Sequence, residues 1–286
     1  MHTWNHARPT IPRPVDARRV AHMSGRQTLH THLFGPDEAD TPIVVALHGL
    51  TGHGKRWSFL AAEHLPDVRI VAPDLLGHGA SSWEPPWAIA DHVAALSAAL
   101  DDHVPAGRRA VVLAHSYGGA IAIRLAHARP DVVSGLVLLD PAQGLHPATA
   151  REYAESSLAH WGYPDAAAAA AAKRMEGWAE VPDHILDAEI ADHLVATDSG
   201  VQWRVSTPGA AVAWSEMARE FVLPPAGLPT HVVVADRVEP PFVGPDFLAA
   251  CAADRSESVT VHHVDTEHMV PFLVPGEVAG LVRDLL

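Results

Sequence analysis

Two features of the sequence predict an α/β fold built on a mostly parallel, doubly wound sheet of about eight strands. Short apolar runs rich in β-branched residues alternate with longer segments of helical periodicity, which is typical of parallel strands joined by helical crossovers. Most of these runs are apolar at every position rather than at every second one. Such strands are covered by helices on both faces, so we expect a central sheet with a helical layer on each side.

The predicted elements span most of the chain. The segment 28–34 alternates in polarity and is followed by Gly35-Pro36, so we expect an antiparallel edge strand there. One amphipathic helix is expected over 89–104, where apolar residues recur at three- and four-residue steps, and a last helix begins at Pro275. Buried strands are expected at 43–47, 68–72, 110–114, 136–139, 232–234 and 259–264.

The segment 141–229 interrupts the alternation of strands and helices. It contains no convincing strand, and Asp165 and Asp183, each following a proline, are expected to cap helices. A third helix is expected over 210–221. We therefore expect a helical cap at 141–229, inserted after the sixth strand, on a core formed by 1–140 and 230–286.

Composition narrows the classes of partner. The chain has 20 Lys and Arg against 34 Asp and Glu, a formal net charge of −14, which would be repelled by nucleic acid and by anionic membrane surfaces. Cys251 is the single cysteine, so an intramolecular disulfide is impossible. Residues 1–20 have no apolar signal-peptide core, and no run of 18 apolar residues occurs. We expect a cytoplasmic protein that binds neither nucleic acid nor a membrane.

A serine at the apex of a predicted strand–turn–helix unit indicates the chemistry. Ala114-His115-Ser116-Tyr117-Gly118-Gly119 follows an apolar strand and precedes a helix. A sharp turn with small neighbours at this point presents a nucleophile above the sheet, and the helix N-terminus favours negative charge. The segment departs from G-x-S-x-G only in having Ala114 at the first glycine position. Ser116 is therefore the candidate nucleophile.

Together with three further motifs, this unit resembles the α/β-hydrolase family, specifically its single-domain members with a helical cap. His48-Gly49-Leu50 ends the first buried strand, as the family's H-G-x turn does. Asp74-Leu75-Leu76-Gly77-His78-Gly79-Ala80-Ser81 matches the family's D-x-x-G-x-G-x-S loop. Asp265-Thr266-Glu267-His268 follows the last strand, where the family places its catalytic histidine. The resemblance covers about residues 28–286 and implies the α/β-hydrolase fold.

The resemblance also implies roles for four residues. Ser116 would be the nucleophile and His268 the general base that takes its proton, because a serine hydroxyl reacts poorly without a base. The backbone amides of Leu50 and Tyr117 would form the oxyanion hole, since the tetrahedral intermediate needs donors already in place. Substrate contacts are predicted for His48, Gly49, His115 and Trp161.

Three residues compete for the role of the acid that orients His268. Asp140 ends the strand after the nucleophile helix, where some family members carry their acid. Asp236 lies close to the family's usual acid position, which aligns with Val238, and Glu239 is a third candidate. The choice depends on spatial reach, so Asp140 and Asp236 are equally supported at this point.

Several histidines have other interpretations. His48 and His78 fit motifs that stabilise turns, and His115 beside the nucleophile lines the pocket or packs in the core. The pairs His30-x-His32 and His262-His263 resemble metal ligands, but no third ligand is arranged near them in the sequence. We therefore expect no metal and no cofactor.

The predicted function is hydrolysis of a carboxylic ester or related small acyl compound through an acyl-enzyme. The cap aromatic residues predict a moderately apolar substrate. A lactonase, a thioesterase or a carbon–carbon bond hydrolase would use the same residues and stays an alternative. A non-catalytic ligand receptor on the same fold is an alternative of another class.

Overall fold

A seven-stranded sheet forms the centre of the protein in the computed structural model, which describes residues 27–159 and 161–286. Its order is β1-β3-β2-β4-β5-β9-β10, with β1 antiparallel to β3 and every other neighbouring pair parallel. The strands are β1 (Thr31–Phe34), β2 (Ile43–Leu47), β3 (Arg69–Pro73), β4 (Ala110–His115), β5 (Val133–Leu139), β9 (Thr230–Ala235) and β10 (Val259–Val264). The mostly parallel α/β fold is confirmed, with seven strands described where about eight were expected.

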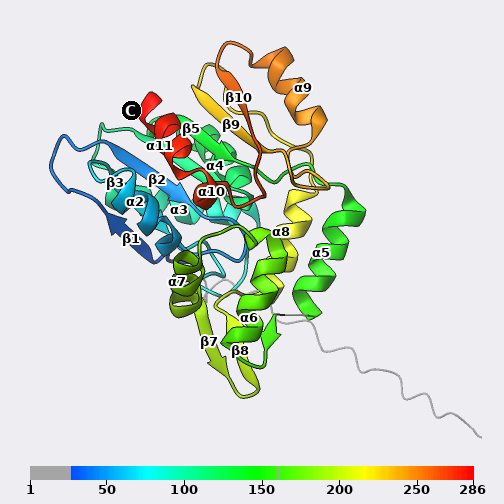
Figure 1. The fold of residues 1–286 in the computed structure, drawn as a ribbon. Helices are drawn as coiled ribbons and strands as arrows, with labels where there is room; N and C mark the ends of the chain where they lie inside the picture. The colour runs from blue at the N-terminus through cyan, green and yellow to red at the C-terminus, as the bar shows by residue number, and fades with distance from the viewer. Residues whose placement is uncertain (1–26, 160) are drawn as a thin grey trace, which may run out of the picture.

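Helices cover both faces of this sheet because its central strands are apolar on both sides. Along β2, Ile43, Val45 and Leu47 belong to one core cluster and Val44 and Ala46 to the other. The first cluster includes residues of α3 (Ile89–His103), α4 (Tyr117–Ala128) and α9 (Pro245–Asp254). The second includes residues of α2 (Ser58–Glu63), α10 (Val270–Leu273) and α11 (Pro275–Asp284). The predicted doubly wound arrangement is therefore present (Figure 1).

The segment between β5 and β9, which we call the cap (141–229), adds further helices and strands to those of the central sheet and its covering helices. Its helices gather together beyond one end of the core in Figure 1. As predicted, Asp165 caps a helix, accepting a hydrogen bond from the Ala168 amide at 2.8 Å. The helical elements are α5 (Pro147–Ala159), α6 (Ala166–Lys173), the irregular turn η2 (Arg174–Trp178), α7 (Asp183–His193) and α8 (Thr207–Met217).

The cap also contains a small antiparallel sheet, which was not predicted from the sequence. Its order is β6-β8-β7, formed by β6 (Gly162–Tyr163), β7 (Leu194–Thr197) and β8 (Gly200–Trp203). The expectation that this segment lacks strands was wrong, because a short hairpin follows α7 directly. Five strands of the described sheet precede the cap, where six were expected. Residues 1–26, which include the segment predicted to lack a signal-peptide core, lie outside the described residues.

Four loops at the carboxyl ends of the parallel strands carry the candidate residues. The turn after β2 holds His48 to Gly52, β4 leads into Ser116, β5 into Asp140, and β10 into the loop of His268. In open α/β sheets this edge is where ligands bind. No helix in 27–159 or 161–286 has both the length and the apolar character needed to cross a bilayer.

Candidate active site

Ser116 lies in a strained turn between β4 and α4. Its backbone has φ 55° and ψ −122°, a conformation that costs free energy for any residue with a side chain. Three hydrogen bonds hold it: the Ser116 amide donates to the Leu139 carbonyl at 3.0 Å, and the Ser116 carbonyl accepts from Gly119 at 2.8 Å and Ala142 at 3.1 Å. The surrounding main chain therefore fixes the direction of the serine side chain.

Glycines allow the neighbouring segments to approach this turn. A Cβ on Gly49 would lie 2.9 Å from the Ser116 Cβ, so the turn after β2 rests directly on the serine. A Cβ on Gly118 would lie 2.6 Å from the His48 carbonyl oxygen, and one on Gly119 would lie 2.6 Å from the Pro141 Cβ. Only glycine at position 49 permits this approach, and its predicted contact with substrate stays a prediction.

We expect the substitution Gly118→Ala to lower the free energy of unfolding by about 1–3 kcal/mol, the usual cost of an added methyl group in a filled core. The clash is with rigid main chain, since the Leu47 and His48 carbonyl oxygens lie 2.8 and 2.6 Å from the added carbon. Urea unfolding monitored by circular dichroism measures the change. The matched control is Gly280→Ala on the exposed side of α11, where an added Cβ meets nothing within 4 Å and alanine favours the helix. A Gly118→Ala variant as stable as this control would contradict the close approach.

His268 pairs with Asp140. The His268 Nδ1 lies 2.6 Å from the Asp140 Oδ2, and the carboxylate is 1% exposed. Since a carboxylate accepts, Nδ1–H donates and Nε2 is left free to accept a proton. Asp140 is itself held, because its amide donates to the Val233 carbonyl at 2.8 Å and its Oδ1 accepts the Ala235 amide at 3.3 Å.

The other two acid candidates lie elsewhere. The Asp236 Oδ1 is bound to His263 Nδ1 at 2.7 Å, and both side chains are about half exposed. Glu239 is exposed and precedes the cis bond to Pro240. Of the three candidates, the structure brings only Asp140 to His268 among the residues it describes.

Two buried histidines hold the main chain around the site. His115 Nε2 donates to the His268 carbonyl at 2.8 Å, and the two rings pack with centroids 4.5 Å apart. His48 Nε2 accepts the Leu75 amide at 2.9 Å, so its Nδ1 donates to the Gly49 carbonyl at 2.8 Å. Burial lowers the pKa of both imidazoles well below the usual value, which keeps them neutral.

These contacts give His48 and His115 a structural role, while their predicted contact with substrate stays a prediction. Both side chains are buried, and each uses a ring nitrogen on a main-chain carbonyl. The alternative interpretation, in which His48 stabilises a turn, fits the structure. His78 behaves in the same way, since its Nδ1 donates to the Leu76 carbonyl at 2.9 Å.

The backbone amides of Leu50 and Tyr117 are the predicted donors of the oxyanion hole. Tyr117 is the first residue of α4 and Leu50 follows the close contact between Gly49 and Ser116. Among the residues described, neither amide donates a hydrogen bond within the chain. The first amides of a helix lack intrahelical acceptors and carry the positive end of the helix dipole. Both amides therefore stay without an acceptor among the described residues, as the predicted oxyanion hole requires.

An aromatic cluster packs against the His268 ring. The Phe242 ring packs on His268 at a centroid distance of 4.5 Å and on Trp214 at 6.5 Å. Tyr153 packs on both Phe242 and Trp214. Next to it, a cavity of about 190 Å³ is lined by Tyr153, Phe242 and parts of 144–149 and 240–245. Trp161 is partly buried and packs with Trp203 and the small cap sheet, and its predicted contact with substrate stays a prediction.

The histidine pair His30-x-His32 has a carboxylate, that of Asp74, close to it in the structure. The ligand atoms of His30, His32 and Asp74 lie within 4.8 Å of one another, so the expectation of no third ligand near His30-x-His32 was wrong. The strand β1 pairs with β3, which ends at the residue before Asp74. The Asp74 carboxylate already accepts the amides of Gly54 at 2.7 Å and Ala80 at 2.9 Å. We interpret this group as shaping the loops at the carboxyl end of β3.

Comparison with known proteins shows the family to which the chain belongs. Residues 44–281 match the model of the Alpha/beta hydrolase family. The chain is 44% identical over 259 residues to "Lipase LipV" of Mycobacterium tuberculosis. This alignment covers 90% of this chain and 97% of that protein. Similar solved structures include E-2-(acetamidomethylene)succinate hydrolase, with a TM-score of 0.75, 18% identity and coverage of 91% and 96%. A marine microorganism esterase matches with a TM-score of 0.69, 15% identity and coverage of 91% and 100%. With four sequence motifs, the fold and a family match over most of its length, this chain belongs to the alpha/beta hydrolase family.

Proposed function

We propose that this protein is a serine hydrolase of carboxylic esters that works through an acyl-enzyme. The observation that carries the proposal is the hydrogen bond of 2.6 Å between His268 and the buried Asp140 carboxylate, near the strained Ser116 turn. The relative with 44% identity is named a lipase, which supports an ester as the substrate. The alternative activities, those of a thioesterase or a lactonase, would use the same catalytic groups.

The mechanism follows from the positions of these groups. Ser116 Oγ attacks the ester carbonyl carbon while His268 Nε2 takes its proton, and Asp140 stabilises the imidazolium that forms. The carbonyl oxygen becomes negative and accepts hydrogen bonds from the amides of Leu50 and Tyr117. His268 then protonates the leaving alcohol, and the acyl group stays on Ser116. Water, deprotonated by His268, releases the acid and restores the serine.

The proposed substrate is a small, neutral, moderately apolar ester. Phe242, Tyr153 and Trp214 form an aromatic wall that begins at His268, and the cavity of about 190 Å³ lies against it. Such walls bind acyl or alcohol groups by excluding water from apolar surface. We further propose a cytoplasmic location, for which the support is the absence of any cysteine besides the buried Cys251.

The test combines active-site labelling with turnover. A fluorophosphonate is expected to add once per chain, on Ser116 by peptide mapping, and a His268→Ala variant is expected to resist labelling. The same preparation is expected to hydrolyse p-nitrophenyl esters of neutral acyl chains with a higher kcat/KM than esters of short charged acids. A folded protein whose Ser116 stays unlabelled would contradict the hydrolase proposal, and a preference for charged acyl groups would contradict the apolar substrate.

A further inference from the structure

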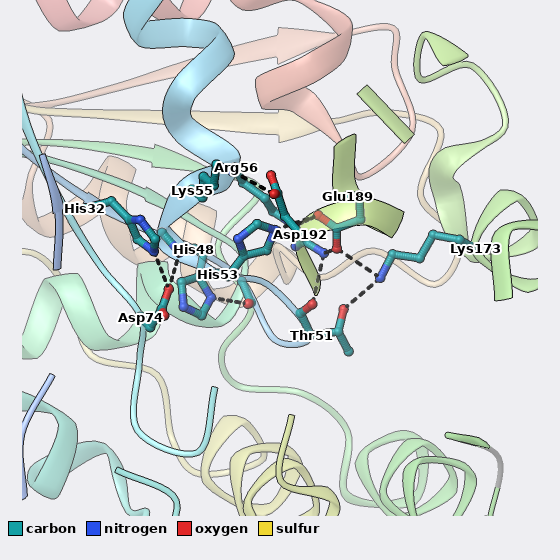
Figure 2. A network of polar contacts seen from close by, with 12 residues as sticks. His32, His48, Thr51, His53, Lys55, Arg56, Asp74, Lys173, Glu189 and Asp192 are labelled. Carbon is teal, nitrogen blue, oxygen red and sulfur yellow. Dashed lines mark hydrogen bonds and ion pairs between the residues drawn. The ribbon is translucent and has the colours of Figure 1, made fainter. Parts of the chain in front are cut away.

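A buried charge cluster connects the cap to the turn that carries Leu50 (Figure 2). Glu189, on α7 of the cap, accepts hydrogen bonds from Arg56 Nε at 2.8 Å and from Arg56 Nη2 at 2.5 Å. The same carboxylate lies 3.0 Å from His53 Nε2. Arg56 belongs to η1 (Gly54–Trp57) of the core, and the side chains of Arg56 and Glu189 are 8% and 2% exposed. A two-pronged ion pair, largely shielded from water, therefore joins cap and core.

The cluster ends on Thr51, the residue after Leu50. Arg56 Nη2 also donates to the Thr51 carbonyl at 2.9 Å. Lys173, at the end of α6 in the cap, donates from Nζ to Thr51 Oγ1 at 3.3 Å and lies 3.8 Å from the Glu189 carboxylate. Two cap helices thus reach one residue of the core turn, α7 through Arg56 and α6 directly.

Thr51 needs such restraint because its backbone is strained. It has φ 65°, and a β-branched residue with positive φ is an outlier. The turn around it is closed by a hydrogen bond from the Gly52 amide to the Gly49 carbonyl at 3.0 Å. Leu50 lies inside that closed turn, so the direction of its amide depends on the conformation of Thr51.

The cluster is not an efficient way to stabilise the fold. Two cations, Arg56 and Lys173, share the single carboxylate of Glu189, and buried ion pairs contribute little to stability because desolvation offsets their attraction. Burial lowers the pKa of Lys173 to about 8, although its ammonium group lies 4.3 Å from the centroid of the Trp203 ring. Because these buried charges add little stability and contact the strained residue Thr51, we interpret the cluster as holding the turn of Thr51 in position.

We propose that Glu189 and Arg56 are positioning residues for the oxyanion hole, through which the cap sets the direction of the Leu50 amide. Glu189 holds the Arg56 guanidinium, Arg56 holds the Thr51 carbonyl, and Thr51 keeps the turn in the form that presents Leu50 to the oxyanion. The inference rests on the proposed hydrolase function. If Glu189 has this role, the active site is complete only when α7 is packed against the core.

The test compares Glu189→Gln with Asp192→Asn. Asp192 also lies on α7 and pairs with Lys55 of η1 at 2.6 Å, but this pair is partly exposed and does not contact Thr51. For a neutral p-nitrophenyl ester, Glu189→Gln is expected to lower kcat about 10- to 100-fold with KM changed less than about 3-fold, since misplacing a donor affects the transition state. Affinity for a trifluoromethyl ketone, which forms the tetrahedral adduct, is expected to fall by the same factor. Asp192→Asn is expected to match the wild type.

A second variant covers the case in which Glu189→Gln does not fold. Arg56→Lys keeps the buried charge balance but cannot bind Glu189 with two prongs and also reach Thr51, so we expect the same loss of kcat and of analogue affinity. Folded variants with wild-type kcat and analogue affinity would overturn the proposal, as would a loss confined to KM or shared by Asp192→Asn. An inactive, unlabelled wild type would instead contradict the hydrolase function itself.

Discussion

Replacement of Ser116 by alanine is expected to lower kcat for an ester by a factor on the order of 10⁶, the loss seen when a serine hydrolase loses its nucleophile. KM is expected to change little, because the aromatic wall beside Phe242 and the amides of Leu50 and Tyr117 are untouched. Steady-state kinetics with a neutral p-nitrophenyl ester measure both parameters. Circular dichroism confirms that the variant is folded, which is expected because Ser116 makes its turn hydrogen bonds through the main chain.

The size of the residual rate distinguishes the competing functions. A Ser116→Ala variant that keeps more than about one percent of the wild-type rate would contradict the acyl-enzyme mechanism, because turnover would then not require Ser116 as the nucleophile. If neither wild type nor variant hydrolyses esters but both bind the same ligand with equal affinity, the ligand-receptor alternative is supported. Titration calorimetry with the ester's acid and alcohol products makes that comparison.

Asp140→Asn is expected to lower kcat about 10⁴-fold, because an amide neither stabilises the imidazolium of His268 nor keeps the ring in the required tautomer. The substitution keeps the shape of the side chain. Asparagine also tolerates the positive φ of 44° at this position. The expected effect is therefore chemical rather than structural, and KM and the thermal midpoint should stay near their wild-type values.

The control for this experiment is Asp236→Asn. Its carboxylate bonds His263 on the surface and makes no contact with His268 among the described residues. We expect kcat within about a factor of two of the wild type. A large loss in Asp236→Asn with a small one in Asp140→Asn would reverse the assignment of the acid.

The core of the fold was predictable because local sequence carries its signal. The runs at 43–47 and 110–114 are apolar throughout and lie in buried parallel strands. The cap strands were missed because β7 follows α7 without a break and β6 has two residues. The hairpin of β7 and β8 has one local signal, alternating residues around Asp198-Ser199-Gly200, which competes with the helical pattern before it.

The candidate site was predictable in part, for a different reason. Ser116 and His268 lie in motifs that can be recognised locally. Asp140 and Asp236 could not be separated, because the choice depends on which loop reaches His268 across 128 or 32 residues of chain. The ion pair of Arg56 with Glu189 joins residues 133 positions apart, and no local pattern marks such a partner.

The place of Asp140 has a consequence for how this enzyme can diverge. With Asp140, just after β5, as the proposed acid, the loop after β9, which holds Asp236 and Phe242, supplies no carboxylate to His268. That loop nevertheless supplies the aromatic ring that packs on His268 and lines the neighbouring cavity. We therefore expect mutation, insertion or deletion there to change substrate preference while Ser116, His268 and Asp140 keep their proposed roles. Directed evolution of new ester specificity should accordingly begin with libraries over 237–244.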